Sequence, residues 1–184
     1  MIDLSSTASV LYFAYGGNMN FEQISARCAK PQFVSVARLP GHEIAFYGHS
    51  ERWDGGEETL RAMPGCDLYG VVYELSPSAF DRLDAWQGVK LDGTGGYFHR
   101  PAEVIGLDGA RYSTLLYKKS EMREPSLPSS GYLAHILAGA QAHGLPEDYL
   151  SSLRALSSHQ AGYPVPKPER TDRFLMTGGG GCGC

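Results

Sequence analysis

A glycine-containing turn near the start of the chain has the residue types that could bind an anion. An apolar run over residues 10–14 ends at Tyr15-Gly16-Gly17-Asn18-Met19-Asn20, and Phe21 to Cys28 has the composition of a short helix with Asn20 as its N-cap. Two glycines between a strand and a helix allow successive backbone N–H groups to point at one spot, and the helix N-terminus adds partial positive charge. The turn therefore suits a carboxylate or a phosphate, although a tight turn without a ligand is an equally good interpretation.

A second segment places polar side chains at the end of a helix. Ser76-Pro77 is a strong helix start, because serine caps the first turn and proline fits the first helical position. The helix is expected to run to Gln87 and to stop at Gly88. Asp84 lies one turn before its end and has the usual interpretation of a solvated or capping residue.

The remaining elements are expected to form one α+β domain, a small curled mixed sheet or barrel with helices packed against it. Pro40-Gly41 and Pro64-Gly65 are turn signals that divide two strand pairs. The strands are expected at residues 34–39, 42–47, 58–62, 67–75, 97–105 and 111–117, and two further helices at residues 131–143 and 146–156. Residues 1–9 are expected to be a flexible lead-in, residues 10–157 the domain, and residues 158–184 an extended Pro/Gly-rich tail.

Composition excludes several classes of function. The 184 residues are 42% hydrophobic and 20% charged, which is typical of a globular protein with a sizeable core. The net charge of −4 is spread without long runs of one sign, so neither nucleic acid nor an anionic membrane is an expected partner. No apolar stretch reaches the length of a membrane span, and the N-terminus lacks the basic start of a signal peptide. A cytoplasmic protein is therefore expected.

The cysteines and histidines predict no disulfide framework and no metal site. Cys28 and Cys66 are expected to be small buried hydrophobes, and Cys182 and Cys184 end a run of glycines. A passive glycine-rich end is the favoured interpretation of that tail, although two exposed thiols could also bind a soft metal, exchange disulfides or attach to a partner. The two histidines of the helix at 131–143 are eight residues apart, so they do not form a ligand pair and are expected on the surface.

Over residues 11 to 156 the chain resembles the gamma-glutamylcyclotransferase family, including its gamma-glutamylamine and butirosin-pathway relatives. The resemblance rests on landmarks that occur in the order of the family. They are the turn at Tyr15 to Asn20, Arg27-Cys28, Gly55-Gly56, Gly70 to Leu75, Leu83-Asp84 with Gly88, Tyr97, Tyr117, Pro125-Ser126 to Tyr132, and Gly139-Ala140 to Gly144-Leu145-Pro146. The resemblance implies the gamma-glutamylcyclotransferase-like fold for almost the whole domain.

The activity that the resemblance implies is a lyase-like acyl transfer within the substrate. The free α-amine of a gamma-glutamyl group attacks its own side-chain carbonyl and releases 5-oxoproline together with an amino acid or amine, as in glutathione metabolism. Because nucleophile and carbonyl belong to one molecule, orientation alone can supply about 7–11 kcal/mol of the barrier reduction. The site must still take a proton from the substrate ammonium and stabilise the developing oxyanion. No cofactor and no metal are expected.

The resemblance also implies which residues bind the substrate. The backbone of the turn, in the family, holds the substrate carboxylate or the oxyanion, which here implicates Tyr15, Gly16, Gly17, Asn18 and Met19. The family usually has serine where this chain has Gly17, so one side-chain contact is lost while the backbone donors are kept. Tyr97 and Tyr117 match tyrosines that line the family pocket, although packing on the sheet would explain them equally well without the resemblance.

The position of the family's general acid/base is occupied by Gln87. Glutamine has nearly the shape of glutamate, but it cannot accept a proton at neutral pH. Removing a general base typically lowers the rate by ~10²–10⁴. Three interpretations are open: a non-catalytic or specialised relative that binds a gamma-glutamyl-like ligand, an enzyme with a relocated base such as Asp84, Asp92 or Glu74, and an introduced glutamine that traps a ligand.

One structural feature distinguishes an enzyme from a binding or regulatory module that has lost the reaction. A carboxylate that points into the pocket near Gln87 favours the enzyme, and a pocket without one favours the binder. In either case the expected partner is a small gamma-glutamyl substrate or ligand. A homodimer is left open.

Overall fold

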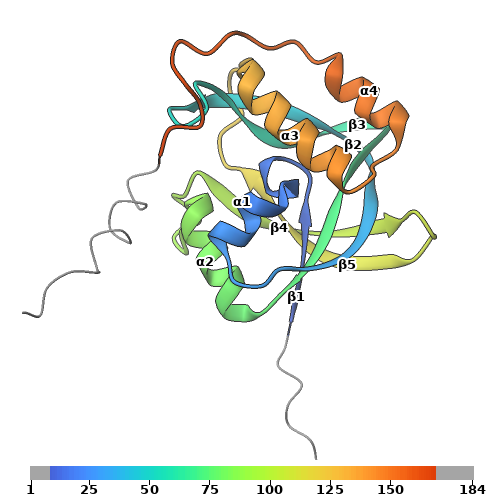
Figure 1. The fold of residues 1–184 in the computed structure, drawn as a ribbon. Coiled ribbons are helices and arrows are strands. Elements are labelled where there is room, and N and C mark those ends of the chain that lie inside the picture. Colours follow the sequence, from blue (N-terminus) through green and yellow to red (C-terminus); the bar gives the residue numbers. More distant parts are fainter. Residues whose placement is uncertain (1–8, 169–184) are drawn as a thin grey trace, which may run out of the picture.

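Five strands close into a barrel and four helices pack on its outside in the computed structural model, which describes residues 9–168 (Figure 1). The strands follow each other around the barrel in the order β1-β3-β2-β4-β5, and a parallel pairing of Tyr12 with Leu115 closes it. The elements are β1 (Val10–Ala14), a 3₁₀ turn η1 (Gly17–Met19), α1 (Phe21–Arg27), β2 (Gln32–Ser50), β3 (Gly55–Leu75), α2 (Pro77–Gln87), β4 (Tyr97–Gly106), β5 (Arg111–Lys119), α3 (Ser130–Ala142) and α4 (Glu147–Arg154). This architecture confirms the predicted α+β class.

The two strand pairs expected before residue 76 are in fact one long antiparallel ribbon, β2 with β3. Pro40-Gly41 and Pro64-Gly65 do not end the strands, because pairing continues beyond them, from Pro40 opposite Asp67 to His42 opposite Ala62. Gly41 and Gly65 take positive φ angles of 70° and 86°, so they shape an irregularity where residues 63–66 face a single residue of β2. A turn signal inside a paired ribbon therefore produced a bulge, and the prediction of separate strands was wrong.

The helix starts and stops agree with the sequence signals. Gly88 ends α2 with a φ of 64°, and Gly144 follows α3 with a φ of 68°. At three helix starts a side-chain oxygen accepts the N–H of the residue three positions later: Asn20 from Gln23 at 3.1 Å, Ser76 from Ala79 at 3.2 Å and Ser129 from Tyr132 at 3.2 Å. Local capping therefore sets where α1, α2 and α3 begin.

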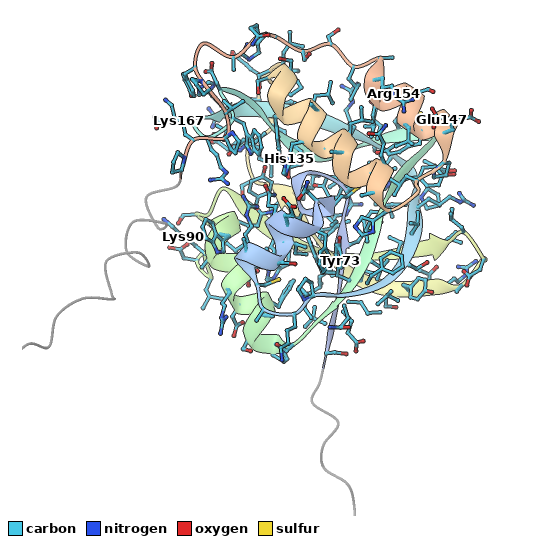
Figure 2. The ribbon with its side chains drawn as sticks, viewed as in Figure 1. Tyr73, Lys90, His135, Glu147, Arg154 and Lys167 are labelled. Carbon is cyan, nitrogen blue, oxygen red and sulfur yellow. The ribbon has the colours of Figure 1, made fainter. Side chains whose placement is uncertain are left out.

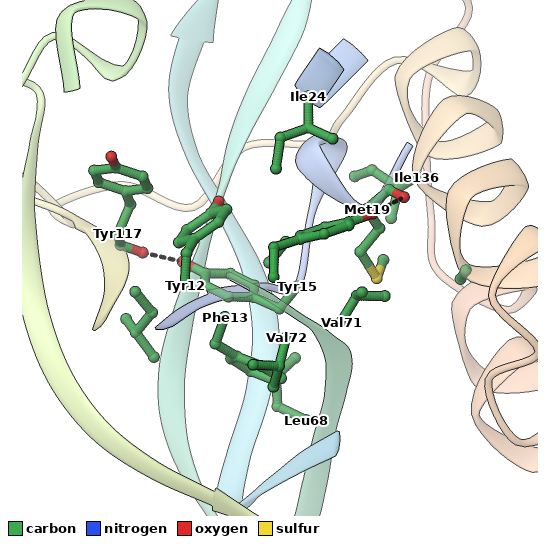
Figure 3. Close-up of a cluster of buried hydrophobic side chains, with 14 of the residues drawn as sticks. Tyr12, Phe13, Tyr15, Met19, Ile24, Leu68, Val71, Val72, Tyr117 and Ile136 are labelled. Carbon is green, nitrogen blue, oxygen red and sulfur yellow. Dashed lines mark hydrogen bonds between the residues drawn. The ribbon is translucent and has the colours of Figure 1, made fainter. Parts of the chain in front are cut away.

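The core fills the barrel and continues under α3. Phe13, Leu68 and Val72 pack together inside the strands, and Val71 and Ile136 of α3 lie beside Met19 of the turn η1 (Figure 3). Each of these side chains is almost fully buried. The helix α3 is thus held on the same apolar core as the turn, which fixes the position of residues 15–20.

Several single-residue expectations need correction. Cys28 is buried as expected, but Cys66 is exposed because it lies at the irregularity of β3. His135 and His143 are only partly exposed, since α3 turns them toward the barrel: His135 lies 4.8 Å from the ring of Trp53, and His143 shares a 2.8 Å hydrogen bond with Tyr73. Figure 2 shows His135 and Tyr73 on the side of the barrel that the helices cover.

The end of the described chain runs over the surface of the domain. Ser130 N–H donates to His159 O at 2.8 Å, and Lys167 N–H donates to Arg52 O at 2.8 Å, so residues 159–167 follow α3 and the β2–β3 connection. Residues 1–8 and 169–184, including Cys182 and Cys184, lie outside the described residues. Between residues 9 and 168, no helix has both the length and the apolar character that crossing a membrane requires.

Substitution of Gly139 by alanine tests the contact between α3 and the turn. A Cβ atom at this position would lie 2.6 Å from Asn20 N and 2.7 Å from Met19 C, which are backbone atoms that cannot move aside independently. Alanine improves helix propensity by about 1 kcal/mol, but overpacking against backbone costs about 1–3 kcal/mol or more, so we expect a net loss of stability.

Urea unfolding provides the measurement. Gly96→Ala is the matched control, because an added Cβ there meets nothing within 4 Å. We expect the control to be within ~0.5 kcal/mol of the parent. A Gly139→Ala protein as stable as the control would show that α3 does not hold the turn as described.

Candidate functional site

A small polar cavity of about 100 Å³ lies where the start of β3, the end of α2 and the start of α3 meet. Most of its lining side chains are charged or aromatic, and they come from six elements or their flanking loops. They are Arg27, Ser50, Arg52, Trp53, Glu57, Glu58, Trp86, Gln87, Tyr97 and Tyr132. Gln87 lines this cavity, whereas no residue of the turn at 15–20 does.

The carboxylate of Glu58 links the cavity to the turn. Gly17 N–H donates to Glu58 Oε1 at an N–O distance of 3.4 Å, and the Tyr132 hydroxyl donates to Glu58 Oε2. The strand that carries Glu58 is held by Tyr97, whose hydroxyl donates to the carbonyl oxygen of Glu58 at 2.8 Å. One carboxylate is thus fixed between the turn and helix α3.

Burial raises the pKa of Glu58 above the usual value for glutamate. The hydrogen bond from Tyr132 and the positive charge of Arg27 act in the opposite direction, and the neighbouring charge of Glu57 adds to the increase. Glu57 itself forms an ion pair with Lys119 Nζ, so the two adjacent carboxylates have different environments. Desolvation of this kind is common for carboxylates that transfer protons.

The side chain of Asn18 supports the turn through hydrogen bonds to three neighbouring side chains. Asn18 is 2% exposed, and its amide nitrogen donates to Tyr12 Oη at 3.0 Å. Its Oδ1 accepts hydrogen bonds from Gln23 Nε2 at 3.0 Å and from Arg27 Nη1 at 2.9 Å. The side chain of Asn18 therefore orients Arg27 at the cavity and is not itself directed at a ligand.

Two other residues of the turn point into the core. Tyr15 is buried, and its hydroxyl donates to the carbonyl oxygen of Tyr117 at 2.5 Å (Figure 3). The Met19 side chain is fully buried beside Ile136. For Tyr15 and Met19 only the backbone can serve the site, because both side chains belong to the core.

The two aspartates considered as substitute bases do not line the cavity. Asp84 Oδ1 is 2.6 Å from His99 Nε2 and accepts the hydroxyl of Tyr117 at 2.6 Å. Asp92 lies in an exposed loop and accepts from the N–H and hydroxyl of Thr94. Tyr117 is therefore occupied with Asp84 and lies outside the cavity, whereas Tyr97 lines it.

Sequence reasoning missed the residues that surround Glu58. Glu58 is placed two positions before the fully buried Leu60 in β3, so strand alternation would have put a carboxylate on an inward face. Trp53 stacks on Tyr132 with ring centroids 4.6 Å apart. No pattern in the sequence indicates this contact, because it depends on residues 79 positions apart.

Comparison with known proteins places the chain in a family. A profile of the AIG2-like family matches residues 67–153. The mouse gamma-glutamylcyclotransferase is 34% identical over 154 residues, which cover 82% of this chain and 80% of the mouse protein. The human protein of the same name is 34% identical over 152 residues, 80% of this chain and 79% of its own length.

The chain belongs to the gamma-glutamylcyclotransferase family. A solved structure of a gamma-glutamyl cyclotransferase superimposes with a TM-score of 0.80 at 30% identity, covering 93% of this chain and all of the other. The gamma-glutamylcyclotransferase fold expected from the sequence is therefore confirmed. The AIG2-like match begins at Asp67, so the turn and Glu58 lie before the segment that it covers.

Replacement of Asp84 by asparagine distinguishes a structural aspartate from a cavity carboxylate. Asparagine keeps the shape but loses the negative charge that binds His99 and Tyr117, and hydrogen bonds to charged groups contribute about 1.5–3 kcal/mol. We expect a lower free energy of unfolding by roughly this amount in urea. The matched control is Asp92→Asn, in an exposed loop, and equal stability of the two variants would contradict a structural role for Asp84.

Proposed function

We propose that this protein releases 5-oxoproline from a gamma-glutamyl amino acid or amine by intramolecular attack of the substrate's α-amine. The observation that carries the proposal is the carboxylate of Glu58, which shares one cavity with Gln87 and contacts the two-glycine turn. A carboxylate in this place is what distinguishes an enzyme from a binder that has lost the reaction. The names and likeness of the relatives support the same activity.

The proposed reaction requires only proton transfers and charge stabilisation. A base accepts one proton from the α-ammonium, the amine attacks the γ-carbonyl carbon, and a C–N bond forms as the carbonyl oxygen becomes an oxyanion. Collapse of this intermediate breaks the bond to the leaving nitrogen. The two protons lost by the α-nitrogen both end on the leaving nitrogen, which departs as an ammonium, so the base is regenerated without an external reagent.

Positive charge at the cavity suits the α-carboxylate of a gamma-glutamyl group. Arg27 is oriented by Asn18, and Arg52 also lines the cavity. Guanidinium groups bind carboxylates with charge-assisted and often bidentate hydrogen bonds. Tyr97 lies on the same cavity wall, and the turn adjoins the cavity through the contact of Gly17 N–H with Glu58.

Room for the leaving group lies next to the cavity. A second hollow of about 300 Å³ is lined by α1, His135 and Pro166, and it shares Arg27, Arg52 and Trp86 with the first. The small cavity would hold the glutamyl group, while the amine or amino acid would extend into the larger hollow. This division supports acceptance of more than one leaving group.

A binding module is the second candidate function. Gln87 favours it, because an amide at the family's acid/base position cannot accept a proton at neutral pH. Such a protein would retain a gamma-glutamyl-like ligand without turnover. An introduced glutamine would have the same effect.

A direct assay decides between these functions. The parent chain and a Gln87→Glu variant are incubated separately with gamma-glutamyl dipeptides and gamma-glutamyl amines, and 5-oxoproline is measured by chromatography. We expect the parent chain to form 5-oxoproline. Formation by the variant alone would identify the parent as a binder, and formation by neither protein would contradict a cyclotransferase.

A further inference from the structure

The proposed reaction requires a base, and the carboxylate of Glu58 lies beside the turn. We propose that Glu58 is the catalytic residue that transfers protons in this site, in place of an acidic group at position 87. The inference rests on the proposed function and adds to it the identity of the base. It is carried by the contacts of Glu58 with the turn and with Tyr132.

The side chain of Glu58 lies directly on the turn. A Cβ atom added at Gly16 would lie only 2.4 Å from Glu58 Cγ and 2.7 Å from its Oε1, so the carboxylate fills the space beside the Gly16 backbone. Together with the 3.4 Å contact to Gly17 N, this places the acid directly beside the turn. A base must lie within hydrogen-bond reach of the proton it removes, and Glu58 meets that condition for an amine bound beside the turn.

Gly17 makes this arrangement possible. A Cβ atom there would lie 3.2 Å from Tyr132 Oη and 2.9 Å from Gln23 Nε2, so any larger residue would push against the hydroxyl that holds Glu58. This chain departs from the family at two positions, Gly17 in the turn and Gln87 at the end of α2. The carboxylate of Glu58 compensates for these two departures. The acid has moved from helix α2 to strand β3.

The neighbouring carboxylates are engaged elsewhere. Glu57 forms an ion pair with Lys119, and Asp84 is held by His99 and Tyr117. Glu58 accepts hydrogen bonds from Tyr132 and from Gly17 N–H, and the positive charge of Arg27 also acts on it. Its carboxylate is therefore the one that contacts the turn, and burial, the largest influence on its pKa, raises that pKa.

The proton transfers follow from this position. The Glu58 carboxylate accepts one proton from the α-ammonium, so an N–H bond breaks and an O–H bond forms. After attack on the γ-carbonyl carbon, the resulting carboxylic acid gives its proton to the leaving nitrogen while the C–N bond breaks. The second proton passes from the ring nitrogen to the leaving amine, and Glu58 returns to the carboxylate.

Three variants test the proposal with 5-oxoproline formation as the readout. Glu58→Gln removes the base and keeps the shape, so we expect kcat/KM to fall by ~10²–10⁴. Glu103→Gln is the matched control, because Glu103 is an exposed residue of β4 that pairs with Arg111, and its kcat/KM should equal that of the parent. The double variant Glu58→Gln/Gln87→Glu returns a carboxylate to the same cavity and should recover activity relative to Glu58→Gln.

The outcomes separate the two proposals. An inactive parent would overturn the cyclotransferase function and, with it, the role of Glu58. An active parent whose Glu58→Gln variant retains its kcat/KM would leave the function standing and overturn the role of Glu58. A folded double variant without recovery would show that Glu58→Gln fails for a reason other than loss of a base, which also overturns the inference.

The pH profile provides a readout that a structural role would not change. Because the base must be unprotonated and burial raises its pKa, kcat/KM of the parent should fall on the acid side at a pH above the usual glutamate value of about 4.3. The groups that face Glu58 are Tyr12 of β1, Tyr15 of the following turn, Arg27 of α1, Glu57 of β3, Tyr97 of β4 and Tyr132 of α3. Their tyrosine pKa values are all raised, so these tyrosines stay protonated in this range. An acid limb at or below the usual glutamate pKa would contradict the proposal.

Discussion

The backbone of helix α3 lies directly against the turn η1, and the site depends on this contact. One face of α3 presents Tyr132, Ile136, Gly139 and His143, spaced as a helix requires. Gly139 allows the close approach to the turn, and Ile136 buries the contact. The same face brings the Tyr132 hydroxyl to Glu58 and His143 to Tyr73, so the position of α3 determines where the carboxylate is held.

The turn is supported equally from the barrel side. Asn18 is buried with its amide nitrogen on Tyr12 and its oxygen shared between Gln23 and Arg27. Tyr73 donates to the carbonyl oxygen of Met19 at 3.2 Å. Burial of the Glu58 carboxylate is unfavourable for stability, and the hydrogen bond from Tyr132 and the positive charge of Arg27 offset part of that cost, so the carboxylate needs structural support. The rigid turn and the capped helix supply that support here.

Local signals predicted the elements well, and long-range contacts account for what was missed. Asn20 and Ser76 cap α1 and α2 as the sequence indicates, because capping depends on neighbours three residues away. The ribbon β2–β3 was divided wrongly, because a turn signal does not reveal whether pairing resumes beyond it. The sequence left a curled sheet and a barrel open, because the strand pattern does not reveal whether the sheet edges close, and the structure shows a closed barrel.

The candidate site was only partly predictable for the same reason. Gln87 and Tyr97 line one cavity, but the carboxylate near them comes from a strand residue 41 positions after Gly17 and 74 positions before Tyr132. Asp84 was one of the substitute bases that the sequence suggested, and only the fold shows that His99 and Tyr117 bind it. Which acidic residue faces the turn is decided by barrel closure and by α3, and neither leaves a local pattern.

The central claim is that a desolvated carboxylate has taken over the role of the missing glutamate. NMR titration of side-chain ¹³C-labelled glutamate in the folded protein tests it most directly, with the Glu58→Gln variant assigning the resonance. The account predicts that the Glu58 carboxyl titrates at a higher pH than the exposed glutamates, because burial raises its pKa. Titration of Glu58 at or below the pH of those glutamates would contradict it.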